Sequence, residues 1–187
     1  MEFREMVDAE DDNIAAIADW LNGTTHEVRA KAVCTLSRRS QRRLWHKAES
    51  QPLMTLSDLV PISVGASRQV IHHGWNTLPL PAPLRRFQKR FCRPLDDDSR
   101  LFGYNEGLVR GLIGPGYFQA VSSHGKVSWE ERGGVTVDYF RVPDADVVEG
   151  WPRVRANSRG LQFFVYHRTR DFLRKISTHV SVGATYK

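Results

Sequence analysis

Residues 114–140, GPGYFQAVSSHGKVSWEERGGVTVDYF, form the stretch that decides the fold class. Within it, apolar and aromatic residues at 117–121, 127–129 and 135–140 are separated by turns that contain glycine. Short segments of this kind are typical of antiparallel strands that follow one another in a meander. We therefore predict strands over these three segments.

The segment that follows the meander is compatible with two structures. Apolar residues alternate at 161–165, as they would in a strand, but a helical stripe extends further along the chain. This stripe persists over four turns, through Leu161, Val165, Phe172 and Ile176. We therefore predict a long C-terminal helix, with a short final strand at 180–182.

The first 50 residues predict a helical hairpin. Apolar residues of the first helix, residues 10–22, lie on one face: Ile14, Ile17, Ala18 and Leu21. The second helix begins at Thr24 and extends to about residue 48, because Thr24 and Glu27 have the spacing of a capping box.

The middle of the chain carries weaker patterns. Residues 69–71 can open a strand, and the alternate prolines at 79–83 favour an extended path. Residues 84–93 predict a short basic helix. The whole pattern gives an α+β fold, in which the N-terminal helical hairpin precedes a curved antiparallel β-sheet packed against a long C-terminal helix.

We divide the chain into an acidic-then-basic helical segment, 1–50, and an α+β domain, 51–187, with one continuous domain as the alternative. The chain has 187 residues and a formal net charge of +6. It contains no apolar run near the ~18 residues that a membrane-spanning helix needs, and its acidic N-terminus is unlike a signal peptide. Two isolated cysteines favour a reducing compartment. We therefore predict a soluble, cytoplasmic protein without a transmembrane segment.

The positive charge is unevenly distributed. Residues 1–27 contain eight acidic residues and one arginine, so the positive excess belongs to the rest of the chain. Two interpretations follow: the basic part binds a polyanion, or the acidic segment folds back onto it.

The predicted basic helix, residues 28–48, supports a nucleic-acid-binding hypothesis. Arg38 and Arg42 lie one turn apart with Trp45 nearby, so guanidinium groups can contact phosphates while the indole stacks on a base. A second basic stretch adds Arg85, Arg86 and Lys89. The same arginines can equally form a solvated face, pair with the acidic helix, or rest on an anionic membrane.

A ligand-binding hypothesis starts from Arg168, which the helical wheel places in the apolar stripe of the C-terminal helix. An unpaired charge there is costly, so either a carboxylate such as Asp138 or a ligand anion meets it. The candidate partners of the ligand are Tyr104 as an orienting donor, Asn105, Glu106 and Tyr139. Six aromatic residues would line the pocket, unless they fill a core instead: Phe102, Tyr117, Phe118, Trp129, Tyr139 and Phe164.

No motif of the sequence supports catalysis, a metal site or a cofactor. It lacks G-x-S-x-G and H-E-x-x-H, and its glycine-rich stretch at 103–116 matches no phosphate-binding loop. We therefore favour a non-enzymatic protein that binds a small, mostly apolar ligand with an anionic group, in a pocket between the sheet and the C-terminal helix. A nucleic-acid-binding or regulatory protein, and a protein-interaction domain without catalysis, are the alternatives.

Overall fold

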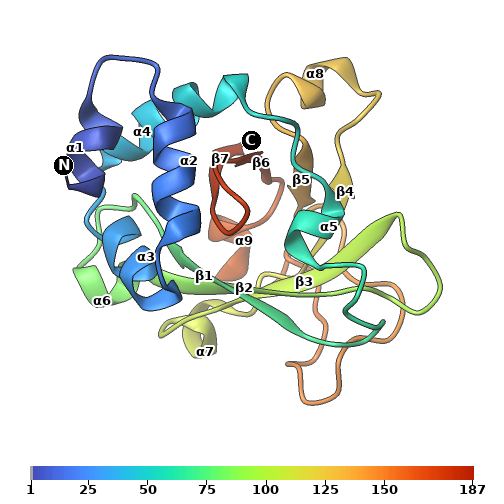
Figure 1. Cartoon of the computed structure of the whole chain (residues 1–187). Coiled ribbons are helices and arrows are strands. Elements are labelled where there is room, and N and C mark those ends of the chain that lie inside the picture. Colours follow the sequence, from blue (N-terminus) through green and yellow to red (C-terminus); the bar gives the residue numbers. More distant parts are fainter. Residues whose placement is uncertain (1) are drawn as a thin grey trace.

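In the computed structural model, which describes residues 2–187, N-terminal helices precede a seven-stranded sheet that curls into a half-barrel (Figure 1). The strands follow chain order across the sheet, and each pair of neighbours is antiparallel. They are β1 (Val70–Trp75), β2 (Arg86–Cys92), β3 (Arg100–Glu106), β4 (Phe118–Ser122), β5 (Val135–Asp138), β6 (Arg170–Lys175) and β7 (Ser181–Tyr186). The predicted meander is therefore confirmed at β4 and β5.

The helical hairpin predicted for the first 50 residues is divided into four helices. They are α1 (Phe3–Asp8), α2 (Ile14–Gly23), α3 (His26–Val33) and α4 (Arg38–Lys47), followed by the 3₁₀ turn η1 (Ala48–Ser50). The predicted second helix breaks because the hydroxyl of Ser37 accepts a hydrogen bond from the Ser40 amide at 3.1 Å and starts a new helix there. Thr25, rather than Thr24, caps α3.

The remaining helices are single turns: α5 (Leu56–Leu59), α6 (Ala82–Arg85), α7 (Arg110–Ile113), α8 (Val127–Glu130) and α9 (Gln162–Val165). Two local predictions are wrong here. Residues 84–93 form the end of α6 and then β2, because Phe87 and Phe91 alternate with outward-facing residues in a strand paired on both sides. The predicted strand at 127–129 is α8.

The long C-terminal helix is also wrong. Its predicted span contains only the single turn α9 and then β6, which pairs with β5 on one side and β7 on the other. These two ladders satisfy the backbone of 170–175 as completely as a helix would, and they turn Phe172 and Leu173 to opposite faces. The chain therefore ends in a β-hairpin.

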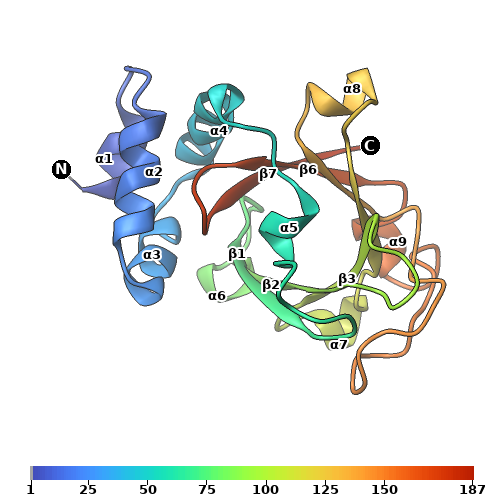
Figure 2. The same cartoon turned by 45° about the vertical axis from the view of Figure 1, so that its right-hand side comes forward.

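Two clusters of buried apolar side chains hold the fold together. One fills the concave side of the half-barrel, with Phe91, Leu101, Phe118 and Val137 among its members. The other lies among α1, α2 and α4 and includes Ile176 from the β6–β7 hairpin. Figure 2 shows the N-terminal helices grouped on one side of the sheet, near β7.

The acidic N-terminal segment folds back onto the basic helix α4. Arg43 donates to the carbonyl oxygen of Asp8, and Lys47 donates to that of Asp11 and, at 2.9 Å, to Oδ1 of Asn13. The acidic segment therefore packs on α4 through main-chain carbonyl oxygens and Asn13, and none of the ion pairs within residues 2–187 joins its carboxylates to α4. None of the helices in residues 2–187 is both long and apolar enough to cross a membrane.

The meander determines which connections meet. In an antiparallel sheet whose strands follow chain order, alternate connections lie at the same end. The connections β1–β2 (76–85), β3–β4 (107–117) and β5–β6 (139–169) therefore share one end with the last residues of β7. We call this end the loop end.

Candidate functional site

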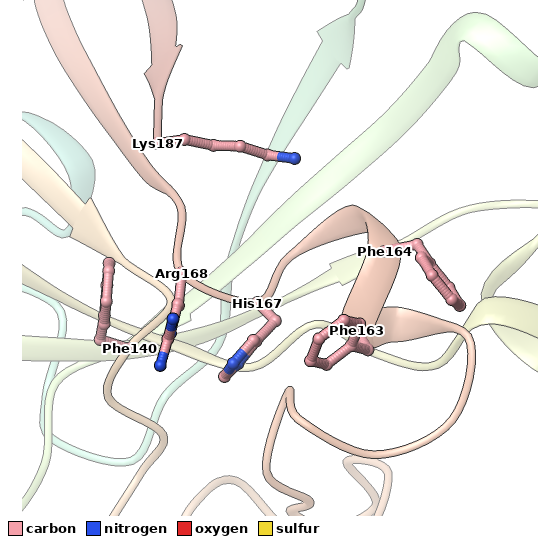
Figure 3. A pocket seen from close by; sticks show the side chains of 6 residues that line it. All are labelled: Phe140, Phe163, Phe164, His167, Arg168 and Lys187. Carbon is pink, nitrogen blue, oxygen red and sulfur yellow. The ribbon is translucent and has the colours of Figure 1, made fainter.

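A hollow of about 440 Å³ opens at the loop end (Figure 3). The β5–β6 connection and the residue that follows β7 supply its lining, which consists of three phenylalanine and three basic side chains: Phe140, Phe163, Phe164, His167, Arg168 and Lys187. Its volume falls within the range of small-molecule sites, and its lining combines apolar walls with a few charged groups, as such sites do.

Arg168 lies in the short link between α9 and β6, not in a helix. Its backbone is in the left-handed region, with φ at 58°, which non-glycine residues rarely adopt. Its side chain is exposed, and none of the ion pairs or hydrogen bonds within residues 2–187 involves it. Figure 3 shows the guanidinium group between Phe140 and His167. Asp138, the predicted partner, pairs instead with Arg170 at 3.3 Å.

The aromatic walls of the hollow are organised by contacts with each other and with basic groups. The ring of Phe163 stacks on His167 at 4.7 Å and meets Phe164 edge-on at 5.5 Å. The guanidinium group of Arg170 lies 4.2 Å from the ring of Phe140. The walls therefore carry positive charge close to apolar surface, which suits a ligand with both an apolar body and a negative group.

The two phenylalanines of α9 face outward because other residues of this turn are anchored inward. The buried Gln162 donates to the carbonyl oxygen of Ala156 at 2.9 Å and accepts from the amide of Gly116 at 3.4 Å. Tyr166 stacks on Tyr139 at 5.2 Å. With both anchors inside, Phe163 and Phe164 remain on the surface, where 46% and 76% of their area is exposed.

Directly beneath the loop end, a buried polar network crosses the concave side of the sheet. Nζ of Lys89 donates to Asn105 Oδ1 at 3.1 Å, to Asp171 Oδ2 at 2.9 Å, and to the hydroxyl of Tyr139. That hydroxyl also donates to Asp171 at 3.1 Å, and Thr185 donates to the other carboxylate oxygen at 2.6 Å. The network thus joins β2, β3, β6 and β7.

The protonation of this network follows from its contacts. Burial alone would raise the pKa of Asp171, but the Lys89 ammonium group and the hydrogen bonds from Thr185, Lys89 and Tyr139 outweigh it and lower the pKa. Burial, followed by the charge of Asp171, raises the pKa of Tyr139 well above its ordinary value. The site therefore holds a carboxylate and a neutral phenol, and all three ammonium hydrogens of Lys89 have acceptors. We interpret it as a structural support, since a substrate would have to displace satisfied hydrogen bonds.

The structure separates the predicted ligand-binding residues. Tyr104 lies on the convex face against Trp151, with ring centroids 4.9 Å apart, whereas Asn105 and Tyr139 belong to the buried network. Glu106 forms an ion pair with Arg110 at 2.7 Å. Consecutive strand residues face opposite sides of the sheet, so Tyr104, Asn105 and Glu106 cannot all meet one ligand. None of the four predicted residues lines the hollow of Arg168.

The predicted nucleic-acid-binding residues are also dispersed. Arg38, Arg42 and Arg86 are exposed, but Trp45 is buried, with the guanidinium group of Arg174 at 4.1 Å from its ring. The predicted exposed indole is therefore wrong, because tertiary packing covers this face of α4. Arg85 stacks on Trp75 at 4.4 Å, and Lys89 faces the interior.

The aromatic residues predicted to line a pocket mostly fill the protein. Phe102, Tyr117, Phe118 and Tyr139 are buried, and only Phe164 reaches the hollow. Four residues line the hollow that no sequence pattern had predicted there: Phe140, Phe163, His167 and Lys187. The adjacent Phe163-Phe164 pair was the available signal, because two neighbouring aromatic residues in a strand or a helical turn cannot both face the same core.

Within residues 2–187, no group of three or more histidine, cysteine, aspartate and glutamate residues is arranged to hold a metal ion. No protein-family model, curated protein or solved structure matches the chain. The hollow at the loop end is therefore the candidate site on its geometry alone.

Proposed function

We propose that the protein binds a small amphipathic molecule, with an apolar body and one anionic group, in the hollow at the loop end. The observation that carries the proposal is the unpaired, exposed Arg168 beside three phenylalanine side chains. The phenylalanine rings supply apolar area for the body of the ligand, and Arg168 and Lys187 supply charge for its anionic group.

The strained backbone of Arg168 supports this role. A non-glycine residue in the left-handed region costs on the order of 1 kcal/mol, and such residues concentrate at ligand-binding sites. Two anchors flank it: the partly buried Tyr166, which stacks on Tyr139, and the buried Thr169, whose hydroxyl donates to the carbonyl oxygen of Tyr166 at 2.7 Å. The contacts of Tyr166 and Thr169 therefore hold the strained backbone of Arg168 in place.

Calorimetric titration with dodecanoate, and with dodecanol as the uncharged probe, tests the proposal. A hydrogen-bonded charge pair contributes roughly 1.5–3 kcal/mol, so Arg168→Ala should weaken dodecanoate binding about 10- to 100-fold and leave dodecanol binding nearly unchanged. Arg141→Ala is the matched control, because Arg141 is exposed next to Phe140 but does not line the hollow.

Two results would contradict the proposal. One is equal binding of dodecanoate by the wild type and Arg168→Ala. The other is no measurable binding of either probe by the wild type. Phe163→Ser should weaken both probes, since it removes apolar wall rather than charge.

Nucleic-acid binding is a second candidate function, supported by one observation. Arg38, Arg39 and Arg42 are exposed on α4 and form none of the ion pairs within residues 2–187. A labelled single-stranded oligonucleotide, followed by fluorescence anisotropy, tests this candidate. Arg38→Glu with Arg42→Glu should abolish binding, and unchanged binding would dismiss it.

A further inference from the structure

The loop end carries an unusual share of the exposed apolar surface. Eight of the sixteen large hydrophobic side chains that residues 2–187 expose lie in three segments of this end, namely 76–85, 107–117 and 158–169. They are Leu78, Leu80, Leu108, Leu112, Leu161, Phe163, Phe164 and Val165. Leu108, two residues before α7, and Leu112, within it, are 75% and 72% exposed.

These segments lie next to one another. The amide of Gly116 is bonded to Gln162, which joins the β3–β4 connection to α9. Gly107 lies against the backbone of Arg86 and Phe87, which joins the same connection to the first one. In Figure 1, α6 and α7 both lie low in the view. The exposed apolar side chains therefore share one end of the half-barrel.

Within these three segments, which leave out residues 139–157 of the β5–β6 connection with Asp144, Asp146 and Glu149, the charge has a single sign. The three segments contain four arginines and no aspartate or glutamate. Of the four, Arg110 is paired with Glu106, and Arg159 and Arg168 are exposed. Apolar side chains among unpaired cations are the combination that binds the interface of an anionic bilayer, where the apolar groups enter the acyl boundary and the cations contact headgroups.

We propose that the loop end docks onto an anionic lipid surface. The docking itself does not depend on the proposed function. One part of the inference does rest on it: the amphipathic molecule in the hollow would be a lipid of that surface. Most of the exposed side chains are aliphatic, and an aliphatic side chain offers no ring for a base to stack on. This composition favours a lipid partner over a nucleic acid.

Co-sedimentation with vesicles tests the proposal. The probes are vesicles of phosphatidylcholine alone and vesicles with about one third phosphatidylglycerol, at low and high salt. We expect binding to the anionic vesicles that falls with added salt, and at least about tenfold weaker binding to phosphatidylcholine alone. Leu108→Ser with Leu112→Ser should weaken binding to the anionic vesicles about tenfold or more.

A matched double variant controls for exposed apolar area in general. Ile62 and Leu95 are 83% and 79% exposed, and both lie outside the three segments. Leu95 lies in the β2–β3 connection, at the opposite end of the sheet. Ile62→Ser with Leu95→Ser should leave vesicle binding unchanged. All four leucine and isoleucine side chains are exposed, so thermal unfolding of both double variants should match the wild type.

The outcomes are distinguishable from those of the proposed function. Leu108 and Leu112 do not line the hollow, so their double variant should bind free dodecanoate like the wild type. Absence of binding to anionic vesicles, or equal loss in the two double variants, would overturn the docking proposal. Dodecanoate binding that depends on Arg168 would still stand in that case.

Discussion

Replacing Asp171 by alanine tests the energetic weight of the buried network. Lys89 and Asp171 are paired at 2.9 Å, and only 13% and 15% of their side chains are exposed. Removing the carboxylate leaves Lys89 one acceptor short, takes away the acceptor of the Tyr139 hydroxyl at 3.1 Å, and frees Thr185, which reaches solvent. Breaking a buried pair from one side costs about 3–5 kcal/mol. Because the pair retains some solvent contact, we expect a loss near the lower end, about 3 kcal/mol.

Urea unfolding, followed by tryptophan fluorescence, measures this loss. Asp144→Ala is the control: Asp144 is 58% exposed and Arg100 keeps Asp96 and Asp97 as partners, so this loss should be less than about 1 kcal/mol. Lys89→Met combined with Asp171→Ala should be less destabilised than the sum of the single variants, because the double variant leaves no buried charge alone. A purely additive double variant, or a loss below about 0.5 kcal/mol for Asp171→Ala, would refute this account.

The same variant has a defined dependence on pH. The pKa of Asp171 is lowered from its ordinary value of 3.8, so the folded state favours the ionised form. The stability that this carboxylate contributes is therefore present above about pH 4 and disappears as the pH falls through the lowered pKa. The difference in unfolding free energy between wild type and Asp171→Ala should be constant from pH 7 to about 5 and shrink below about 4. A difference that grows with acid would contradict the sign.

Three shorter predictions concern other contacts. Gly116→Ala should destabilise the protein by about 2–3 kcal/mol in urea unfolding, because φ is +53° and a Cβ atom would collide with the ring of Tyr166. Arg174→Ala should cost about 2 kcal/mol and shift tryptophan emission, because the guanidinium group covers Trp45 and donates to its carbonyl oxygen at 2.9 Å. Burial raises the pKa of the Cys92 thiol to about 11, so this thiol should resist a disulfide reagent at pH 8 until urea unfolds the protein; rapid labelling of the folded protein would contradict its burial.

A strand was easiest to predict from the sequence where apolar residues alternate and do not also have helical spacing, as in β5. Val135 and Val137 are buried on one side, Thr136 faces the other, and glycines precede the segment, so β5 could be placed from residues alone. The segment that contains β6 shows both the alternation of a strand and the apolar stripe of a helix. There the outcome depended on β5 and β7, which offer ladders on both sides of 170–175, and no local pattern contains that information.

The candidate site shows the same division. Arg168 was singled out because a charge among apolar residues requires an explanation, and the structure does place it beside apolar side chains in the hollow. Lys89 could not be recognised from the sequence as a buried charge. Leu84, Phe87 and Phe91 have helical spacing, and the basic residues between them resemble the solvated face of a helix. Only the curl of the sheet, which faces β2 toward β6, turns Lys89 into a buried partner of Asp171.

The network and the hollow are neighbours along the chain as well as in space. Tyr139 of the network precedes Phe140 of the hollow, and Thr185 lies two residues before Lys187. Hydrogen bonds to Asp171 therefore fix the backbone from which the walls of the hollow project, and a wall held in place before binding loses less entropy when a ligand arrives. It follows that Asp171→Ala should weaken dodecanoate binding although its carboxylate does not line the hollow. Unchanged affinity in that variant would mean that α9 and its anchors hold the site without the network.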